Sequence, residues 1–227
     1  MNTLLLCTGV PGSAWSMISN RLKKFFEEFD LSDETPERSY AIPDENLKDY
    51  QILRPGWIQK THQGSYFGPY HEFGQHFDEI SNHYTKEQFL DECVKPYSDN
   101  TKPIKLVKSH WFAYNLDWIW ENCKGHKLLL IWRDPEVARD WWYSMGGWNI
   151  NYPVYTWYDN PERMWIKIQE ESNNIWDFAQ RKNIEWHNYT DDLILKTQWG
   201  TDTLTDFNPR VTPIFNDTIK FAIVEIV

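Results

Sequence analysis

Short apolar runs alternate along this chain with segments in which apolar residues recur at helical spacing. An apolar run from Leu4 to Cys7 leads into a segment of small residues. After that segment, apolar side chains recur at helical spacing: Trp15, Ile18, Leu22, Phe25, Phe26 and Phe29. The pattern predicts a strand, a tight loop and a helix in that order.

The second half of the sequence alternates in the same way. Short apolar runs predict strands, and the one ending at Trp132 is apolar enough for the middle of a parallel sheet. The predicted strands are residues 104–107, 127–132 and 184–188, and the predicted helices are 115–122, 136–145 and 161–181. A last apolar run at 219–227 predicts a final strand or a segment packed against the sheet.

The order strand, helix, strand predicts a right-handed crossover and therefore an α/β fold, with a central parallel sheet flanked by helices. At 227 residues the chain suits one domain, residues 1–227, because single cores commonly extend to roughly 250 residues. Residues 30–102 are predicted to form a variable, loop-rich acceptor or lid region. Within it, residues 56–77 combine glycines, three histidines and several aromatic rings.

Composition excludes several classes of function. The net charge is -10 and the 23 Lys and Arg residues are spread along the chain, which argues against nucleic-acid binding. No run reaches the ~20 apolar residues that span a membrane, and no signal peptide is visible. Three cysteines form no even disulfide framework, which favours a cytoplasmic location. The oligomeric state stays open.

The small-residue segment has the composition of an anion-binding loop. It reads Gly9-Val10-Pro11-Gly12-Ser13-Ala14-Trp15-Ser16. Backbone N–H groups in such a turn point into one concavity, and the positive end of the following helix dipole adds to their attraction for phosphate. A P-loop-like phosphate site is therefore expected after the first strand.

Two further segments carry a family resemblance. Lys108-Ser109-His110 is followed by Arg133-Asp134-Pro135 after an apolar strand, and Trp186 to Leu193 adds a strand with Tyr189. Together with the first loop they resemble the sulfotransferases that use 3′-phosphoadenosine-5′-phosphosulfate (PAPS). The resemblance covers about Leu4 to Leu193, with residues 30–102 unmatched in detail. It implies PAPS as co-substrate, no metal, and a small-molecule or carbohydrate acceptor.

The resemblance assigns a role to each matching residue. His110 is the expected general base, since an imidazole with a pKa near 6.5 accepts a proton at neutral pH. Lys108 is expected to stabilise charge on the transferred sulfuryl group. Arg133 is expected to bind the nucleotide 3′-phosphate through two N–H groups, and Tyr189 to lie beside the adenine.

The loop departs from the family pattern. Gly12 stands where the family usually carries a Lys or Arg, so the loop lacks a cation. Ala14 and Trp15 replace a small residue and a hydroxyl residue, whereas Ser13 and Ser16 match hydroxyl positions. Either Lys108 supplies the missing charge, or turnover is slow, or transfer is lost.

The 3′-phosphate side departs as well. The family serine eight residues beyond Arg133 is replaced by Trp141, or by Asp140 if one residue is deleted. Ser144, about one helical turn further, is the candidate substitute. The family's Arg-Lys-Gly segment near the C-terminus is not visible, and Arg210 is the nearest replacement.

Three other interpretations were weighed. A nucleoside triphosphate kinase is disfavoured, because Trp15 occupies the lysine position of the Walker pattern. A metal site is disfavoured because the spacings of His62, His71, His76 and His83 match no usual ligand pattern. A non-catalytic module that retains a nucleotide or acceptor cleft stays open as the alternative to the enzyme.

Overall fold

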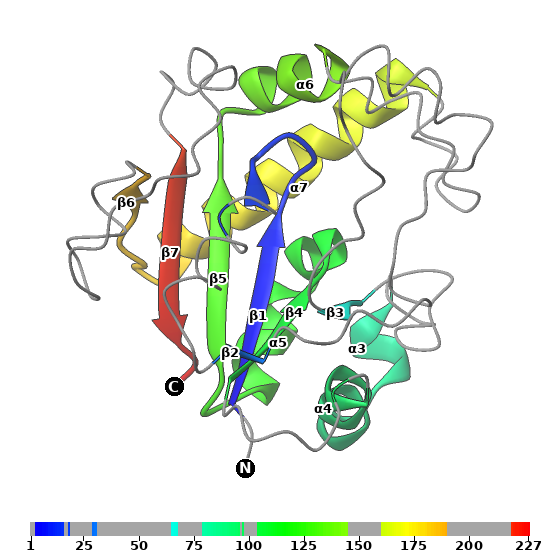
Figure 1. The fold of residues 1–227 in the computed structure, drawn as a ribbon, viewed down its shortest axis with the longest axis vertical. Coiled ribbons are helices and arrows are strands. Elements are labelled where there is room, and N and C mark those ends of the chain that lie inside the picture. The colour runs from blue at the N-terminus through cyan, green and yellow to red at the C-terminus, as the bar shows by residue number, and fades with distance from the viewer. Residues whose placement is uncertain are drawn as a thin grey trace.

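The computed structural model describes residues 3–15, 18, 29–30, 65–67, 79–95, 97, 104–144, 160–189 and 219–227 (Figure 1). The strands are β1 (Thr3–Gly9), β2 (Phe29–Asp30), β3 (Ser65–Tyr66), β4 (Ile104–Lys108), β5 (Lys127–Trp132), β6 (His187–Asn188) and β7 (Lys220–Glu225). The helices are α3 (Ile80–His83), α4 (Lys86–Val94), the 3-10 helix η2 (His110–Tyr114), α5 (Leu116–Asn122), α6 (Pro135–Ser144) and α7 (Pro161–Arg181).

The strands form one mixed sheet in the order β2-β4-β1-β5-β7-β6, with β3 also paired to β4. Strands β2, β4, β1 and β5 run parallel, whereas β7 is antiparallel to both β5 and β6. The connection from β4 through α5 to β5 crosses over β1. The predicted α/β class with parallel central strands is therefore confirmed, and the sheet gains an antiparallel pair at one edge.

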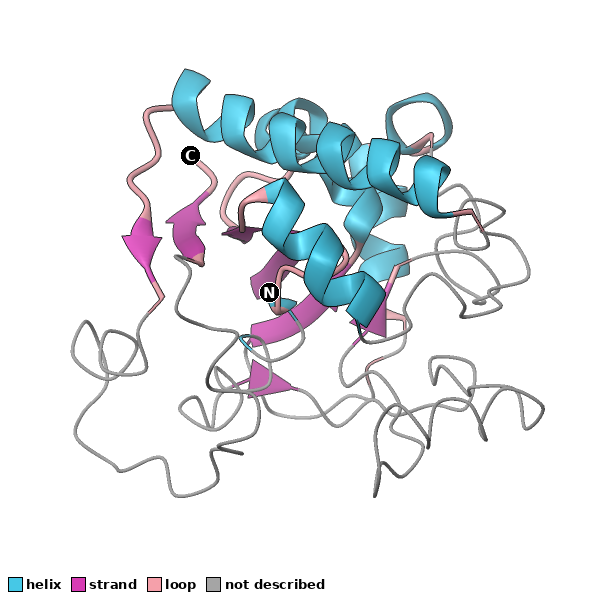
Figure 2. Cartoon of the chain, turned by 90° about the horizontal axis from the view of Figure 1, so that it is seen from above, coloured by secondary structure: helices cyan, strands magenta, loops and turns pink. Residues whose placement is uncertain are grey.

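Different apolar side chains are buried on the two faces of the sheet, because successive side chains of a strand point to opposite sides. One face packs against the helices, which gather on that side (Figure 2). Its contacts include Phe89 of α4, Ile119 of α5 and Ile168 of α7. The other face carries Leu5, Cys7, Leu129 and Ile131 of β1 and β5, together with Trp15 and Ile18.

Most predicted elements of the second half are confirmed within one or two residues. Strand β4, strand β5 and helices α5, α6 and α7 lie where the apolar pattern put them, and β7 supplies the final strand. The segment predicted as a strand at 184–188 forms only the two-residue β6. Helix α7 begins with a side-chain cap, since Asn160 accepts hydrogen bonds from the N–H groups of Glu162 and Arg163.

Two expectations from the first half need correction. Phe29 was assigned to the apolar stripe of the first helix, but Phe29–Asp30 is a strand paired with Ile104 and Lys105 of β4. The loop-rich region also holds helices α3 and α4. Helix α4 starts with a capping box. The Thr85 side chain accepts a hydrogen bond from the Gln88 N–H, and the Gln88 side chain accepts one from the Thr85 N–H.

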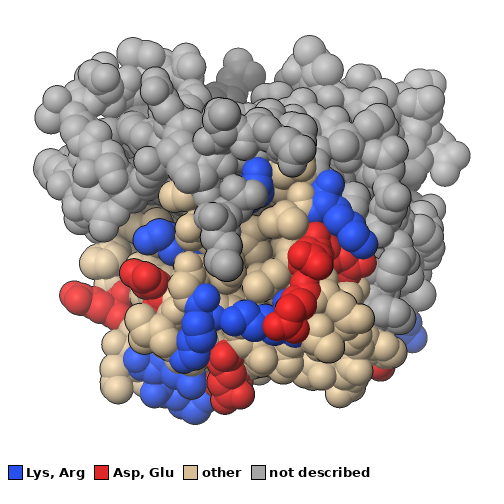
Figure 3. All heavy atoms as spheres, turned by 90° about the horizontal axis from the view of Figure 1, so that it is seen from below, with Lys and Arg blue, Asp and Glu red and all other residues tan. Residues whose placement is uncertain are grey.

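Charges of both signs are interspersed on the described part of the surface seen from below (Figure 3). Arg181 pairs with Asp117 at 2.6 Å, and Lys167 pairs with Glu170 at 2.7 Å. Among the described residues, no helix is both long enough and apolar enough to cross a membrane.

Candidate functional site

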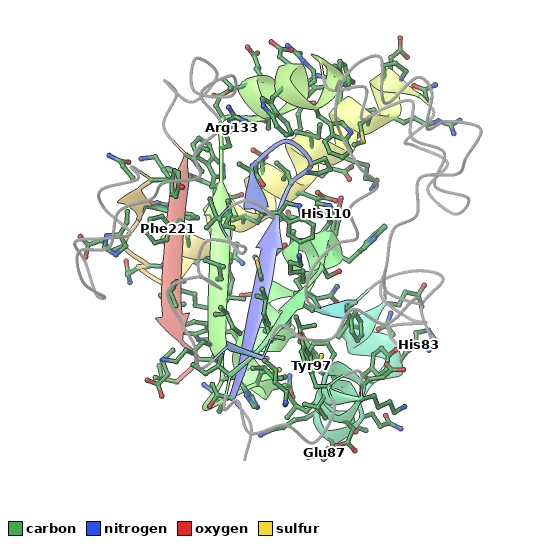
Figure 4. The ribbon with its side chains drawn as sticks, viewed as in Figure 1. His83, Glu87, Tyr97, His110, Arg133 and Phe221 are labelled. Carbon is green, nitrogen blue, oxygen red and sulfur yellow. The ribbon has the colours of Figure 1, made fainter. Side chains whose placement is uncertain are left out.

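The loops that follow β1, β4 and β5 meet at one edge of the sheet, because these three neighbouring strands are parallel. His110 and Arg133 lie there, beside the ends of β1 and β5 (Figure 4). Lys108 is the last residue of β4, and its main chain pairs with Cys7 of β1. Ligands of open α/β sheets bind outside this carboxyl edge. The structure thus brings together the residues predicted from three separate segments.

The loop after β1 is a tight turn. The Ser13 N–H donates to the Val10 carbonyl at 3.0 Å, with Pro11 and Gly12 in the two central positions. Gly12 has a φ of 83°, and Pro followed by a residue of positive φ is the pattern of a type II turn. Because Pro11 has no N–H and the Ser13 N–H is used inside the turn, neither of these positions offers an amide to an anion.

The loop then enters a helix through a strained residue. Ala14 has a φ of 66°, a conformation that non-glycine residues seldom adopt outside turns and functional sites. Its carbonyl accepts the first helical hydrogen bond, from the Ile18 N–H at 3.0 Å. The N-terminus of this helix therefore lies directly after the turn, as the anion-site interpretation requires.

Gly12 has no room for a side chain. A Cβ at this position would lie 2.0 Å from the backbone oxygen of Ala138 in α6. The Gly12 carbonyl in turn accepts a hydrogen bond from Arg133 Nη1 at 2.7 Å. Helix α6 and the residue after β5 thus both hold the turn, and this close packing leaves no room for a side chain at position 12.

His110 is held against the same loop. Its Nδ1 lies 2.5 Å from the Gly9 carbonyl oxygen, and its ring is buried. Since a carbonyl only accepts, Nδ1 carries the proton and Nε2 is the basic nitrogen of the neutral ring. Burial lowers the pKa of His110 to about 4; the Gly9 hydrogen bond raises it and the Lys108 charge lowers it further.

Trp15 packs against Lys108 at the end of β4 and against His110 at the start of η2. The indole and the His110 imidazole have centroids 4.1 Å apart at an interplanar angle of 36°. Lys108 Nζ lies 5.9 Å from the Trp15 ring centroid, within range of a cation–π contact. Lys108 is fully buried, so its ammonium faces the protein interior at the sheet edge and not open water.

Ser13 places a hydroxyl in the same region. Its Oγ is buried and has no hydrogen-bond partner among the described residues. It lies 2.8 Å from where a Gly9 Cβ would be. A buried hydroxyl normally has a partner, so Ser13 is a candidate donor to a bound anion.

The N-terminus of α6 is already satisfied by the protein itself. Asp134 Oδ1 accepts from the N–H groups of Glu136 and Val137 at 2.9 and 3.2 Å. These amides are therefore used inside the chain, and the negative Asp134 would repel a phosphate at this helix.

The remaining predicted site residues lie further from this cluster. Tyr189 follows β6 at the same sheet edge, two strands or roughly 10 Å from β5. It is half-buried and packs edge-on against Phe221. Ser144 ends α6, six residues and about 9 Å along the helix from Ala138. Ser16 lies outside the described residues, as does Arg210.

Sequence reasoning missed a buried carboxyl. Glu171 lies on the inward stripe of α7 between Ile168 and Ile175 and is 5% exposed. Its Oε2 has no hydrogen-bond partner among the described residues. Burial raises the pKa of Glu171 well above its usual range, and the nearby Lys167 charge opposes this shift. The helical spacing of Glu171 from the apolar residues Ile168 and Ile175 is the sequence feature that indicates an inward-facing position.

Comparisons of this chain with protein-family models, with curated proteins and with solved structures returned no match.

Proposed function

We propose that this protein is a sulfotransferase, which moves the sulfuryl group of PAPS to a hydroxyl or amine of a small-molecule or carbohydrate acceptor. PAPS is a co-substrate in this reaction. The residues proposed to act on it come from the loop after β1, from Lys108 and His110, and from Arg133, which all lie at the carboxyl edge of the sheet.

The observation that carries the proposal is the hydrogen bond between His110 Nδ1 and the Gly9 carbonyl. It ties a candidate base directly to the loop that would bind the phosphosulfate, and it fixes the tautomer in which Nε2 is basic. Sulfuryl transfer needs a base close to the bound group, because the acceptor must lose a proton as it attacks, and this hydrogen bond places the base beside the loop.

In the proposed step, His110 Nε2 takes the proton of the acceptor hydroxyl. The acceptor oxygen forms a bond to sulfur, and the bond between sulfur and the bridging phosphate oxygen breaks. The products are a sulfate ester and adenosine 3′,5′-bisphosphate, and the imidazolium releases its proton to solvent. The pKa of about 4 means that His110 is unprotonated at neutral pH, and it also makes the imidazole a weaker base than one with a pKa near 7.

Positive charge would come from residues outside the loop. Gly12 cannot carry a cation, so the Lys108 ammonium is proposed to stabilise charge that develops on the bridging oxygen. The Arg133 guanidinium has five N–H donors, and Nη1 uses one of them on Gly12. The same guanidinium is proposed to bind the 3′-phosphate.

One observation favours the alternative, a module that binds nucleotide without transferring a group. The turn at Gly12 is packed so closely on Ala138 that position 12 cannot carry a cationic side chain. A site without that charge retains backbone and Arg133 contacts for binding but loses one source of transition-state stabilisation.

The test is transfer from sulfur-labelled PAPS to a panel of phenols, alcohols, sugars and amines, with the wild type and His110→Gln. The proposal predicts a sulfated product with the wild type and a loss of roughly 100-fold or more with His110→Gln, while adenosine 3′,5′-bisphosphate still binds. His187→Gln is the matched control, since His187 is exposed on β6; its transfer rate should equal that of the wild type.

The outcomes separate the two functions. Bisphosphate binding without transfer to any acceptor would favour the module. Equal transfer by the wild type and His110→Gln would remove His110 from the mechanism. Absence of both binding and transfer would contradict both functions.

A further inference from the structure

We infer that Trp15 is a positioning residue, whose indole holds the His110 imidazole against the loop and keeps water away from it. The kinetic part of this inference rests on the proposed function. The structural part concerns only the state of the His110 ring. Trp15 is a departure from the family pattern, so its role has to come from its contacts in this chain.

The contacts of Trp15 restrict the His110 ring on one side. The ring centroids are 4.1 Å apart, and the tilt of 36° lets the indole cover part of the imidazole. On its edge, the imidazole donates from Nδ1 to the Gly9 carbonyl. Rotation of the imidazole about its side-chain torsions would break the hydrogen bond or collide with the indole.

Trp15 also supports the acceptor of that hydrogen bond. A Cβ on Gly9 would lie 3.1 Å from the Trp15 Cβ and 3.2 Å from the Ile131 Cβ. The Gly9 backbone is therefore packed between the start of the helix and β5. One residue thus contacts both the imidazole ring and the glycine that binds it.

The indole itself is anchored. Trp15 is 5% exposed and belongs to the apolar set with Cys7, Leu129 and Ile131 on its face of the sheet. A side chain fixed by the sheet is a rigid support, and catalytic groups need such support because small displacements cost large factors in rate. A hydroxyl residue at this position would leave the His110 ring partly uncovered.

The cover has an electrostatic effect that can be measured. Exclusion of water disfavours the imidazolium, which agrees with burial as the main cause of the low pKa of His110. The Gly9 hydrogen bond raises this pKa and the Lys108 charge lowers it, and both groups are present in the wild type and in the Trp15 variants. If Trp15 supplies much of this cover, its removal should move the pKa of His110 upward toward 6.5. A role limited to packing the core would leave the pKa and the tautomer unchanged.

The experiment is a nitrogen NMR titration of the histidines in the full chain, with the His110 signal assigned through His110→Gln. In the wild type we expect the Nδ1–H tautomer and titration near pH 4. Trp15→Phe should retain both, because the phenyl ring preserves the cover. Trp15→Ala should show mixed tautomers and a titration midpoint closer to 6.5.

Trp120→Ala is the matched control, since Trp120 is half-buried and packs on Phe178 of α7, away from the site. It should lose stability while leaving the His110 titration unchanged. If Trp15→Ala does not fold, Trp15→Leu and Trp15→Phe give the same comparison. An unchanged His110 titration and tautomer in folded Trp15→Leu would overturn the inference.

The kinetic readout is the pH profile of sulfuryl transfer. In Trp15→Ala we expect kcat to fall by roughly 10- to 100-fold and the acid limb of the profile to move to higher pH. A wild type without transfer would contradict the proposed function, while the NMR titration would still decide the role of Trp15.

Discussion

Arg133 donates a hydrogen bond from Nη1 to the Gly12 carbonyl at 2.7 Å, which joins the end of β5 to the turn after β1. Arg133 is fully buried, so this contact is made away from water. The residue proposed to bind the nucleotide therefore also fixes the geometry of the loop beside it. Loss of Arg133 should affect stability and binding together.

Arg133→Met retains much of the side-chain volume and removes every donor. We expect it to lower the free energy of unfolding by about 2 kcal/mol, because the buried Gly12 carbonyl loses a charged donor. Arg181→Met is the control, since its ion pair with Asp117 is more than half exposed and exposed pairs contribute about 1 kcal/mol or less. Urea unfolding of both variants measures the difference. Equal losses would mean that the Gly12 contact contributes no more to stability than an exposed ion pair does.

Gly12 and Gly125 offer a matched pair, since their φ angles are 83° and 82°. A Cβ at Gly12 would meet the Ala138 oxygen at 2.0 Å, whereas at Gly125 nothing lies within 4 Å. Gly125→Ala should cost about 1 kcal/mol from backbone strain alone. Gly12→Ala should cost several times more and should weaken bisphosphate binding. Thermal unfolding measures both, and similar losses would contradict the close packing of the turn on α6.

Glu171 makes stability depend on pH. The folded state raises its pKa above the usual 4.5, so the folded protein holds a proton that the unfolded chain releases. Stability is therefore fully present below about pH 4.5 and falls as the pH rises from there toward the folded pKa. Glu171→Gln removes this dependence, and we expect it to be more stable than the wild type at pH 8.

The control for Glu171→Gln is Glu170→Gln. Glu170 is exposed, and its hydrogen bond with Lys167 lowers its pKa, so its contribution has the opposite sign: it is present above about 4.5 and lost on acidification. Urea unfolding at pH 5 and pH 8 separates the two. A gain in stability at pH 8 with Glu170→Gln, and none with Glu171→Gln, would contradict the assignment of Glu171 as the buried neutral acid.

The three thiols should be unreactive in the folded protein. Cys7, Cys93 and Cys123 are all buried, and no disulfide joins any two of them. Burial raises the pKa of Cys7 and of Cys123 to about 12, against a lowering effect of Lys108 and of Lys86 respectively. A thiol reagent at pH 8 should therefore label all three only in denaturant. Rapid labelling of Cys7 in the native protein would mean that the sheet edge is open.

The central strands could be predicted because burial on both faces leaves an uninterrupted apolar run, as at Leu128 to Ile131. Helix α4 was missed because only Phe89 and Cys93 of its nine residues are buried, which is too few for a helical stripe. The capping box at Thr85 and Gln88 was the local signal. Phe29 was misassigned because its pairing with β4 is a long-range contact that spacing does not encode.

The candidate site was partly predictable for the same reasons. Each motif ends an apolar strand, so parallel neighbours bring Lys108, His110 and Arg133 to one edge. Pro11-Gly12 is a turn signal that a sequence shows directly. The packing of Gly12 on Ala138 and of Trp15 on His110 depends on how distant segments meet. Those contacts could be found only in the structure.

The most direct measurement is the thermal stability of the full chain with adenosine 3′,5′-bisphosphate, compared with ADP and ATP. A ligand at 100 times its Kd that binds only the folded state stabilises it by about 2.7 kcal/mol. We predict a rise in Tm with the bisphosphate that exceeds the rise with ADP or ATP and is absent in Arg133→Ala. No rise, or a larger rise with ATP, would contradict a PAPS site at the loop after β1.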